Sequence, residues 1–249
     1  MDIVYTFWLR SMKRYIRSKS RIVGSIAMPL FFLLFLGFGL NSVVSIPGGG
    51  ENYIAFLIPG MVAMSVMFTS VFSGIQIIWD KQFGFLKETL VAPVTRLEIM
   101  LGQTAGGATT AFIQGVLILV LSIFIGLHAN SVVGFLIAFG FMALIGIAFT
   151  ALGIAIASKM DDMTGFQLIM NFVIFPIFGL SGALFPISSL PPLFAGITLF
   201  DPLTYGVEGI RYGLTGASQI NPVLSLAVLG GFTVAMIVAG AYLFRKIKS

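Results

Sequence analysis

The sequence predicts an all-α polytopic membrane protein with six transmembrane helices. Hydrophobic residues make up 58% of the 249 residues, charged residues only 9%, and the mean hydropathy is +1.05, whereas soluble domains are about half apolar and a quarter charged. The charged residues lie in short segments between long apolar runs. Because a charge at the centre of a bilayer costs at least ~3 kcal/mol, the runs can cross lipid while the charged segments stay in water.

Six apolar stretches reach the length of about 20 residues that a transmembrane helix needs. The predicted spans are Ile22–Leu40, Tyr53–Trp79, Ile99–Leu127, Val132–Ala157, Gly165–Phe185 and Pro222–Phe244. No linker, low-complexity tract or clear internal repeat divides the chain. We therefore predict a single domain over residues 1–249, with its membrane part over residues 22–244.

The distribution of lysine and arginine predicts the orientation. Of the 14 basic residues, all except Arg211 lie before the first span, in alternate connections, or after the last span. Basic residues collect on the cytoplasmic side of membrane proteins. We therefore expect cytoplasmic termini in a multi-pass plasma-membrane protein. The same rule explains the net charge of +5, so we expect contact with membrane lipid and no nucleic-acid partner.

Residues 1–21 predict an amphipathic helix at the membrane interface. At about 100° per residue, one face carries Arg10, Arg14, Arg17 and Arg21, and the opposite face carries Tyr5, Trp8, Met12 and Tyr15. A basic face opposite an aromatic face is typical of helices that lie in the plane of the membrane surface. Two roles stay open: an anchor to anionic lipid, and transmission of motion from a cytoplasmic partner.

The connection after the fifth span, residues 186–221, predicts a broken, re-entrant segment on the outer side. Prolines prevent a continuous helix at Pro186, Pro191 and Pro192. The apolar stretch Leu193–Phe200 is too short to cross the membrane, and irregular backbone at membrane depth requires shielding by protein or by a wet cavity.

A short helix is predicted after this break. Asp201 is a suitable N-cap and Pro202 a suitable first residue. The helix carries Glu208 and Arg211 three residues apart, a spacing that places their side chains together. We expect Asp201, Glu208 and Arg211 to form an outer gate.

The sequence contains no motif that would power transport. No basic or acidic residue lies clearly inside a predicted span, which disfavours an ion-coupled carrier. The GxxxxGK[ST] loop that holds nucleotide phosphates is missing from the sequence. If transport is active, a partner chain binds ATP and Mg²⁺, and we expect no cofactor in this chain. The lack of cysteine and the single histidine, His128, disfavour a metal site.

Residues 80–98 between the second and third spans are the candidate docking site for such a partner. Both charge signs occur there, and Phe83, Leu86 and Leu90 follow helical spacing. Thr95 is a suitable start for the next helix. An amphipathic helix that lies in a groove of a partner is a common recognition mode. A solvated connector explains the composition equally well.

Three motifs carry a resemblance to a known family. They are YIAFLIPG at Tyr53–Gly60, ETLVAPVTRLE at Glu88–Glu98 and DPLTYGVEGIR at Asp201–Arg211. In order and spacing they resemble the ABC-2 family of ABC-exporter membrane subunits, and most of all its daunorubicin-resistance type. The resemblance implies a homodimer with two copies of a cytoplasmic ABC ATPase. It also makes residues 1–21 a connecting helix and Asp80–Leu90 a coupling helix.

The same resemblance assigns the residues that would contact the ATPase. Glu88 and Arg96 occupy the positions of the acidic and basic coupling-region residues of the family, and Asp80 takes the place of the acidic residue near the end of the second helix. The predicted docking residues are Asp80, Lys81, Phe83, Phe85, Leu86, Lys87, Glu88 and Arg96.

Polar side chains inside the spans are the candidates for a translocation path. They form three helical stripes: Thr69, Ser73 and Gln76; Gln103, Thr110 and Gln114; Gln167 and Asn171. Such residues also join helices through hydrogen bonds of roughly 0.6 to 2 kcal/mol, and this second role stays open. A path with few amides among Phe and Met suits a hydrophobic or amphiphilic, drug-like or lipid-like substrate.

Three other functions are alternatives to this one. An exporter of lipid-linked polysaccharide or another cell-envelope precursor would share this architecture. A channel would need no ATPase. A rhomboid-like protease would use Ser181 in the Gly179–Gly182 motif with His128; because His128 precedes the serine in an outer turn, close packing of small residues is the simpler explanation.

Overall fold

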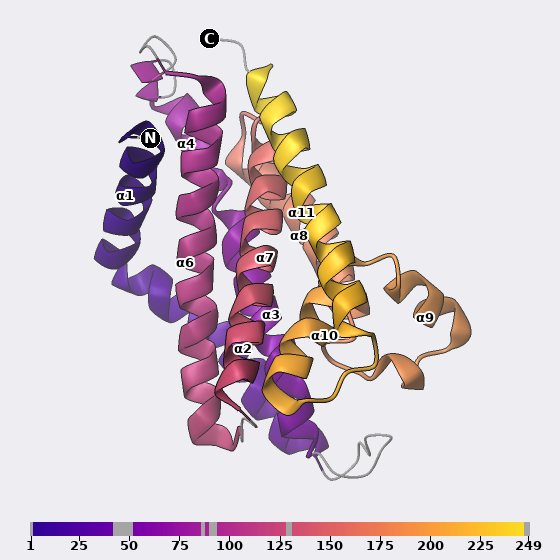
Figure 1. Cartoon of the computed structure of the whole chain (residues 1–249). Helices are drawn as coiled ribbons and strands as arrows, with labels where there is room; N and C mark the ends of the chain where they lie inside the picture. Colours follow the sequence, from indigo (N-terminus) through magenta and orange to yellow (C-terminus); the bar gives the residue numbers. More distant parts are fainter. Residues whose placement is uncertain (1, 42–51, 86–87, 90–93, 128–130, 247–249) are drawn as a thin grey trace.

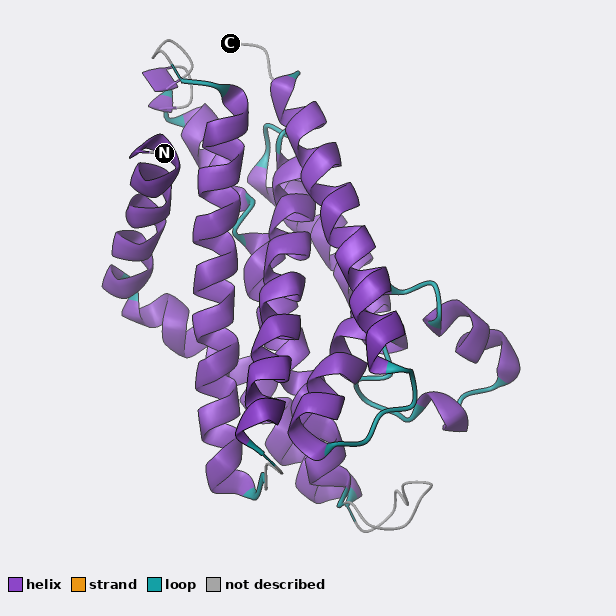
Figure 2. Ribbon diagram, in the orientation of Figure 1, coloured by secondary structure: helices purple, strands orange, loops and turns teal. Residues whose placement is uncertain are grey.

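The computed structural model describes residues 2–41, 52–85, 88–89, 94–127 and 131–246. Within these ranges the chain consists of helices joined by loops, without a strand (Figure 1, Figure 2). The helices are α1 (Asp2–Arg17), α2 (Lys19–Leu40), α3 (Tyr53–Phe72), α4 (Ile75–Gln82), α6 (Arg96–Ile125), α7 (Val132–Ala157), α8 (Met163–Leu180), the 3-10 turn η1 (Ile187–Ser189), α9 (Pro192–Thr198), α10 (Pro202–Thr215) and α11 (Pro222–Arg245).

The predicted fold class is confirmed. Six spans in the described ranges are long and apolar enough to cross a membrane, the second of them made of α3 and α4 together. The start of α1 and the end of α11 lie at the same end of the bundle (Figure 1). We call this the termini end, and the other the opposite end. The fifth span is shorter than predicted, because α8 stops at Leu180 and Gly182 adopts a positive φ of 70° that ends helical geometry.

The second span is interrupted where the apolar pattern predicts a continuous helix. α3 ends at Phe72 and α4 begins at Ile75. A Cβ atom at Gly74, in the joint, would lie 2.5 Å from the carbonyl oxygen of Gly153 on α7, so this close approach requires glycine. Since the 20 residues of α3 span about 30 Å, α3 crosses the hydrocarbon alone and α4 lies at the termini end.

Helix α3 forms the centre of the bundle. In its most apolar stretch 78% of residues are buried, against 17% in α2 and 22% in α8 and in α11. α3 packs against α2, α6, α7 and α10. The less buried helices present large apolar side chains outward, such as Phe35 on α2 at 68% and Phe172 on α8 at 86% exposure. A burial gradient of this kind places the outer helices against lipid or a partner subunit.

The predicted N-terminal amphipathic helix is present, but protein covers much of its apolar face. α1 runs beside α6 (Figure 1). Met12 and Tyr15 are buried there together with Phe7, whereas Tyr5 is 59% exposed. Trp8 donates from its indole nitrogen to Thr109 on α6 at 3.1 Å. The pattern predicted the amphipathic helix correctly and could not show that a neighbouring helix binds its apolar side.

The segment between α8 and α11 is broken, as predicted. α9 projects from the side of the bundle (Figure 1), with Leu193 73% and Phe200 90% exposed. In contrast, α10 is almost wholly buried between α3, α7 and α11. Asp201 caps α10 by accepting from the backbone N–H of Leu203 at 2.9 Å, which confirms the predicted start of this helix.

Candidate functional site

An ion pair with a buried carboxylate joins three helices at the termini end. The guanidinium of Arg10 on α1 donates to both carboxylate oxygens of Asp80 on α4, at 3.0 and 2.6 Å. The amide nitrogen of Gln76 donates to the same carboxylate at 2.7 Å, and that of Gln103 on α6 lies 3.4 Å away. Asp80 is 2% exposed. A bidentate arginine–carboxylate contact with further hydrogen-bond donors is among the strongest polar contacts available to a carboxylate. These contacts therefore fix α4 against α1 and α6.

Lys81 attaches the same short helix to the α7–α8 turn. Its ammonium donates to the carbonyl oxygens of Ser158 at 2.9 Å and Met160 at 2.8 Å, and it pairs with Asp161 at 3.1 Å. Gln82 donates to the carbonyl of Asp161 at 2.9 Å. α4 is therefore bound on two sides, and a displacement of α4 would move α1, α6 and the α7–α8 turn together.

The candidate docking segment begins where these contacts end. Phe83 is 81% exposed and Phe85 37%, and the Phe85 ring lies 3.8 Å from the guanidinium carbon of Arg10. Glu88 is exposed. Arg96 donates to the backbone carbonyl of Arg245 at the end of α11. Two predicted docking residues, Leu86 and Lys87, lie outside the described ranges.

The start of α6 follows the sequence pattern. The Thr95 hydroxyl accepts from the backbone N–H of Glu98, and the Glu98 carboxylate accepts from the backbone N–H of Thr95 at 2.9 Å. This reciprocal capping box fixes the first turn of the helix. It positions Arg96 beside the end of α11.

Two of the predicted polar stripes meet around one cavity of about 250 Å³ at the termini end. Ser73 and Gln76 line it from the α3–α4 side, and Gln103 and Thr110 line it from α6. Arg14 of α1 also lines it. The structure therefore brings together side chains of the two stripes that lie at least 27 residues apart in the sequence.

The remaining members of these two stripes lie close by. Gln114 is fully buried and accepts from the hydroxyl of Tyr15 at 2.9 Å, so it joins α1 to α6. Thr69 lines a second, more apolar cavity of about 300 Å³ between α2 and α3. Tyr15 and Phe72 line both cavities and separate them.

The third stripe faces away from the bundle. Gln167 and Asn171 on α8 are both exposed. Their neighbours include Phe172 at 86% and Leu168 at 62% exposure. Two amides on an otherwise apolar outer surface are expensive in hydrocarbon unless they find a partner or water. This surface of α8 is therefore a candidate contact with another chain or with substrate.

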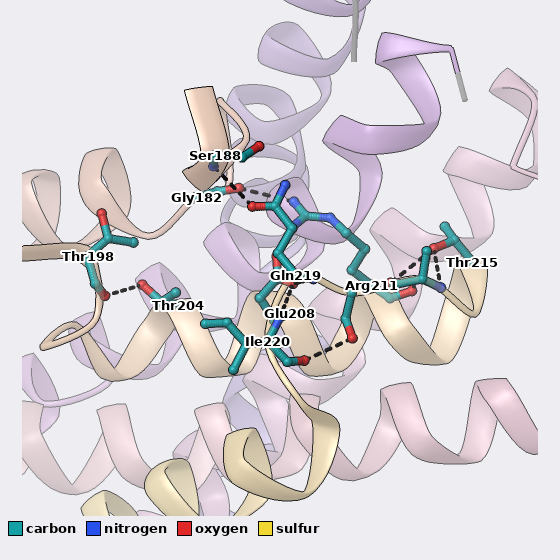
Figure 3. A network of polar contacts seen from close by, with 11 residues as sticks. Gly182, Ser188, Thr198, Thr204, Glu208, Arg211, Thr215, Gln219 and Ile220 are labelled. Atoms are coloured by element: carbon teal, nitrogen blue, oxygen red, sulfur yellow. Dashed lines mark hydrogen bonds and ion pairs between the residues drawn. The ribbon is translucent and has the colours of Figure 1, made fainter. Parts of the chain in front are cut away.

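A second ion pair lies at the opposite end (Figure 3). Glu208 and Arg211 on α10 form a salt bridge at 0% and 4% side-chain exposure. Arg211 also donates to the carbonyl oxygen of Gly182 at 3.0 Å, and Glu208 accepts from the backbone N–H groups of Gln219 and Ile220. These contacts join the end of α8, the middle of α10 and the α10–α11 connection.

Aromatic residues extend this network to α3. The guanidinium carbon of Arg211 lies 4.1 Å from the centre of the Phe56 ring. The Tyr53 hydroxyl donates to the carbonyl of Leu184 at 3.0 Å. The pair predicted at i,i+3 is confirmed. The sequence predicts a gate at the outer end, and in the structure Glu208 and Arg211 are buried at the opposite end of the bundle.

Asp201, the third predicted gate residue, is buried at the start of α10, outside the six spans. Burial raises its pKa to about 7, although the N–H of Leu203 opposes this by favouring the charged form. The other carboxyl oxygen of Asp201 has no hydrogen-bond partner among the described residues. Near neutral pH this carboxyl group is therefore partly protonated.

Three anchoring roles were missed from the sequence. The helical pattern places Arg10 on the basic face of the N-terminal helix, and in the structure it pairs with Asp80. The resemblance predicts an ATPase contact for Lys81, and in the structure its ammonium also binds backbone carbonyls of this chain. The pattern places Tyr15 on the aromatic face of an interfacial helix, and in the structure its hydroxyl binds Gln114. The sequence does contain one indication of the Arg10–Asp80 pair: Asp80 is an acidic residue at the end of an apolar span, and such a residue needs a cation nearby. The sequence offers several arginines and does not single out Arg10.

The described residues show no catalytic arrangement around Ser181 that would support the protease alternative. Ser181 is fully buried, and its hydroxyl donates to the backbone carbonyl of Phe178 at 2.8 Å. His128, its proposed partner, lies outside the described ranges. The carbonyl oxygen of the neighbouring Gly182 accepts a hydrogen bond from Arg211, so this residue has a structural role.

Comparisons with known proteins agree with this architecture. The family model for the ABC-2 type transporter matches residues 3–215. Nodulation protein J of Rhizobium leguminosarum bv. viciae is 30% identical over 227 residues, which cover 90% of this chain and 86% of that protein. Nodulation protein J of Rhizobium meliloti (strain 1021) is 32% identical over the same shares. The inner membrane transport permease YadH of Escherichia coli (strain K12) is 27% identical over 239 residues, or 92% and 90% of the two chains.

The family match and the six apolar helices together characterise a multi-pass plasma-membrane protein that acts as a transport permease subunit. The matched region includes α1 from its second residue onward, the bound helix α4, both ion pairs and all of α10. The chain belongs to the ABC-2 type transporter family.

Proposed function

We propose that this permease subunit is driven by a separate cytoplasmic ATPase and exports a hydrophobic or amphiphilic, drug-like or lipid-like substrate. The family implies an ABC ATPase partner, and the sequence carries no phosphate-binding loop of its own. In this proposal two ATPase copies bind ATP and Mg²⁺, and two copies of this chain form the membrane pathway.

The proposal places the termini end in the cytoplasm. The start of α1, the end of α11 and the segment after α4 all lie there (Figure 1), together with the basic residues Lys81, Arg96, Arg245 and Lys246. The positive-inside rule assigns such an end to the cytoplasm. The exposed Phe83 and Glu88 then face the compartment that contains ATP.

The attachment of α4 is the observation that carries the proposal. An ATPase that presses on the segment beginning at Phe83 would displace α4. The Arg10–Asp80 pair would transfer this displacement to α1 and α6, and Lys81 would transfer it to the α7–α8 turn. A buried, two-sided attachment suits the transmission of force, because packed elements move as rigid units.

The outward-facing amides of α8 support a path shared by two copies. Gln167 and Asn171 are exposed on a surface with Phe172. A second subunit facing this surface would enclose polar groups within an apolar wall. Such a lining suits an amphiphilic substrate, since it offers hydrogen bonds without fixed charge.

The test is purification of the chain from its native membrane in mild detergent, with identification of stoichiometric partners and an assay for ATP hydrolysis. We expect a P-loop ATPase at one copy per permease chain. Reconstituted vesicles should then move a fluorescent amphiphile only when ATP is supplied. A chain that purifies alone, and that conducts solute down a gradient without ATP, would contradict the proposal and favour the channel.

A further inference from the structure

We infer that the cavity between α2 and α3 is a binding site for an uncharged amphiphile whose polar group is a single hydroxyl. The inference goes beyond the proposed function, because the site lies within one chain and its occupancy requires neither a second copy nor an ATPase. It is also distinct from the outward surface of α8, none of whose residues lines this cavity.

The cavity lies where α2 and α3 diverge. At Gly37 of α2 a Cβ atom would lie 3.2 Å from the side chain of Ile54 on α3, whereas at Gly24 it would meet no atom within 4 Å. Pro29 lies inside α2 between these two positions, and a proline in a helix interior is a common cause of bending. The two helices therefore leave a hollow of about 300 Å³ on the Gly24 side of Pro29.

The wall of this cavity is mostly apolar. None of its lining residues is charged, and Met28, Met64 and Phe68 contribute long apolar side chains. Met28 is 48% exposed on a membrane-spanning helix, so a molecule dissolved in the hydrocarbon can reach the cavity. A charged ligand would lose its hydration there without gaining an opposite charge. The lining therefore selects an uncharged ligand.

An unpaired hydroxyl lies in this apolar wall. Ser65 is 2% exposed, and its hydroxyl oxygen has no hydrogen-bond partner among the described residues. At about 100° per residue, Ser65 lies near the middle of the α3 face that lines the cavity, between Met64 and Thr69. A buried polar group without a partner is uncommon, and it is expensive at membrane depth. A ligand in the cavity can supply the missing partner.

A backbone acceptor lies on the opposite wall. Pro29 has no N–H, so the carbonyl of Ser25, four residues earlier in α2, loses its intrahelical donor. Ser25 also lines the cavity. A ligand hydroxyl can accept from Ser65 and donate to the Ser25 carbonyl at the same time. A carbonyl, ether or alkane group cannot do both.

The volume limits the length of the ligand. An apolar cavity of about 150 Å³ is large enough to bind benzene, so a cavity of about 300 Å³ has room for an alkyl chain of roughly eight to ten carbons. A medium-chain alcohol matches both the size and the polarity of the site.

The test uses the purified full chain in lipid vesicles and two photoreactive probes, octanol and octane, each with a diazirine on its alkyl chain. Both probes are compared at equal concentration in the membrane, and mass spectrometry locates the labelled residues. We expect octanol to label α2 and α3 around Met28 and Met64 in a saturable way. It should exceed octane at least about tenfold, because octane forfeits the hydrogen bonds. Labelling that does not saturate, or equal labelling by both probes, would overturn the inference.

Ser65→Ala tests the hydroxyl in the cavity wall. It should lower octanol labelling about tenfold. Since the hydroxyl has no partner among the described residues, the thermal midpoint should not fall. The control is Ser70→Ala, which removes another buried and unpaired hydroxyl from α3 outside the cavity lining. If octanol labels both variants alike, Ser65 does not hold the ligand and the inference fails.

Pro29→Ala tests the acceptor on α2. It returns an N–H that can pair with the Ser25 carbonyl, so octanol labelling should fall at least about threefold. Pro176→Ala makes the same change inside α8, away from the cavity, and should label as wild type does. Wild-type labelling of both Ser65→Ala and Pro29→Ala would show that no hydroxyl is recognised. All these measurements use the chain alone, so the lack of an ATPase partner would contradict the proposed function and leave this result unchanged.

Discussion

At the scale of single residues, the buried Glu208–Arg211 pair makes the opposite end sensitive to charge. Both side chains are almost fully enclosed, and removing one member of such a pair typically costs about 3–5 kcal/mol because the other charge stays buried. We therefore expect Glu208→Gln to lower the thermal midpoint clearly in detergent. Adding Arg211→Met should recover part of the loss. If the double variant is as unstable as the sum of the single variants, the two residues are not coupled.

Asp201 gives a residue-level prediction about pH. Burial raises its pKa to about 7, above its ordinary value of 3.8, so between these values the folded protein binds more protons than the unfolded chain. Stability from this group is therefore highest at low pH and falls as pH rises towards 7, by up to about 1.4 kcal/mol per pH unit. Asp201→Asn keeps a capping side chain and should flatten this dependence in thermal unfolding measured from pH 4 to 8.

The matched control for Asp201 is Asp162. It caps α8 in the same way, by accepting from the N–H groups of Thr164 and Gly165, but it is exposed. Asp162→Asn should leave the pH profile unchanged. Equal profiles for wild type and Asp201→Asn would show that Asp201 is not the group responsible.

At the scale of elements, the close contact between α1 and α6 depends on a small residue. A Cβ atom at Gly106 would lie 2.5 Å from the Ser11 hydroxyl oxygen and 2.6 Å from its Cβ. Gly106→Val should separate the two helices at a cost of about 1–3 kcal/mol and speed hydrogen exchange in α1. The control is Gly140→Val on α7, where a Cβ atom would meet open space. In this variant the amides of α1 should exchange at the wild-type rate.

The segment after α4 gives a second prediction at this scale. Phe83 is 81% exposed beside a helix fixed from two sides, so Phe83→Asp should leave the fold intact and uncouple ATP hydrolysis from transport. Lys87→Glu should have the same effect. Phe200→Asp is the control, because this side chain is 90% exposed on the segment between α8 and α11. If Phe83→Asp and Lys87→Glu both bind the ATPase fully and still couple ATP hydrolysis to transport, the docking site lies elsewhere.

At the scale of the whole molecule, the proposed path between two subunits makes a prediction for the outward surface of α8. Asn171→Leu removes an exposed amide from this surface. It should shift the relative transport rates of amphiphiles that differ in polarity and leave assembly with the ATPase unchanged. Reduced expression or loss of the complex would instead assign Asn171 to contacts that hold helices together.

The sequence by itself determined the membrane class, the six spans, the capped start of α10 and the i,i+3 pair Glu208–Arg211. Each of these depends on composition or on spacing along one helix, and bilayer thickness and helical periodicity impose them locally.

Only the tertiary structure decided which partners the polar residues have. It bound Asp80 to Arg10, Lys81 to the α7–α8 turn and Gln114 to Tyr15, and it gathered two polar stripes around one cavity. The physical reason is that every apolar helix face satisfies the bilayer about equally well, so hydropathy does not choose neighbours. Close packing and hydrogen bonding between distant segments make that choice.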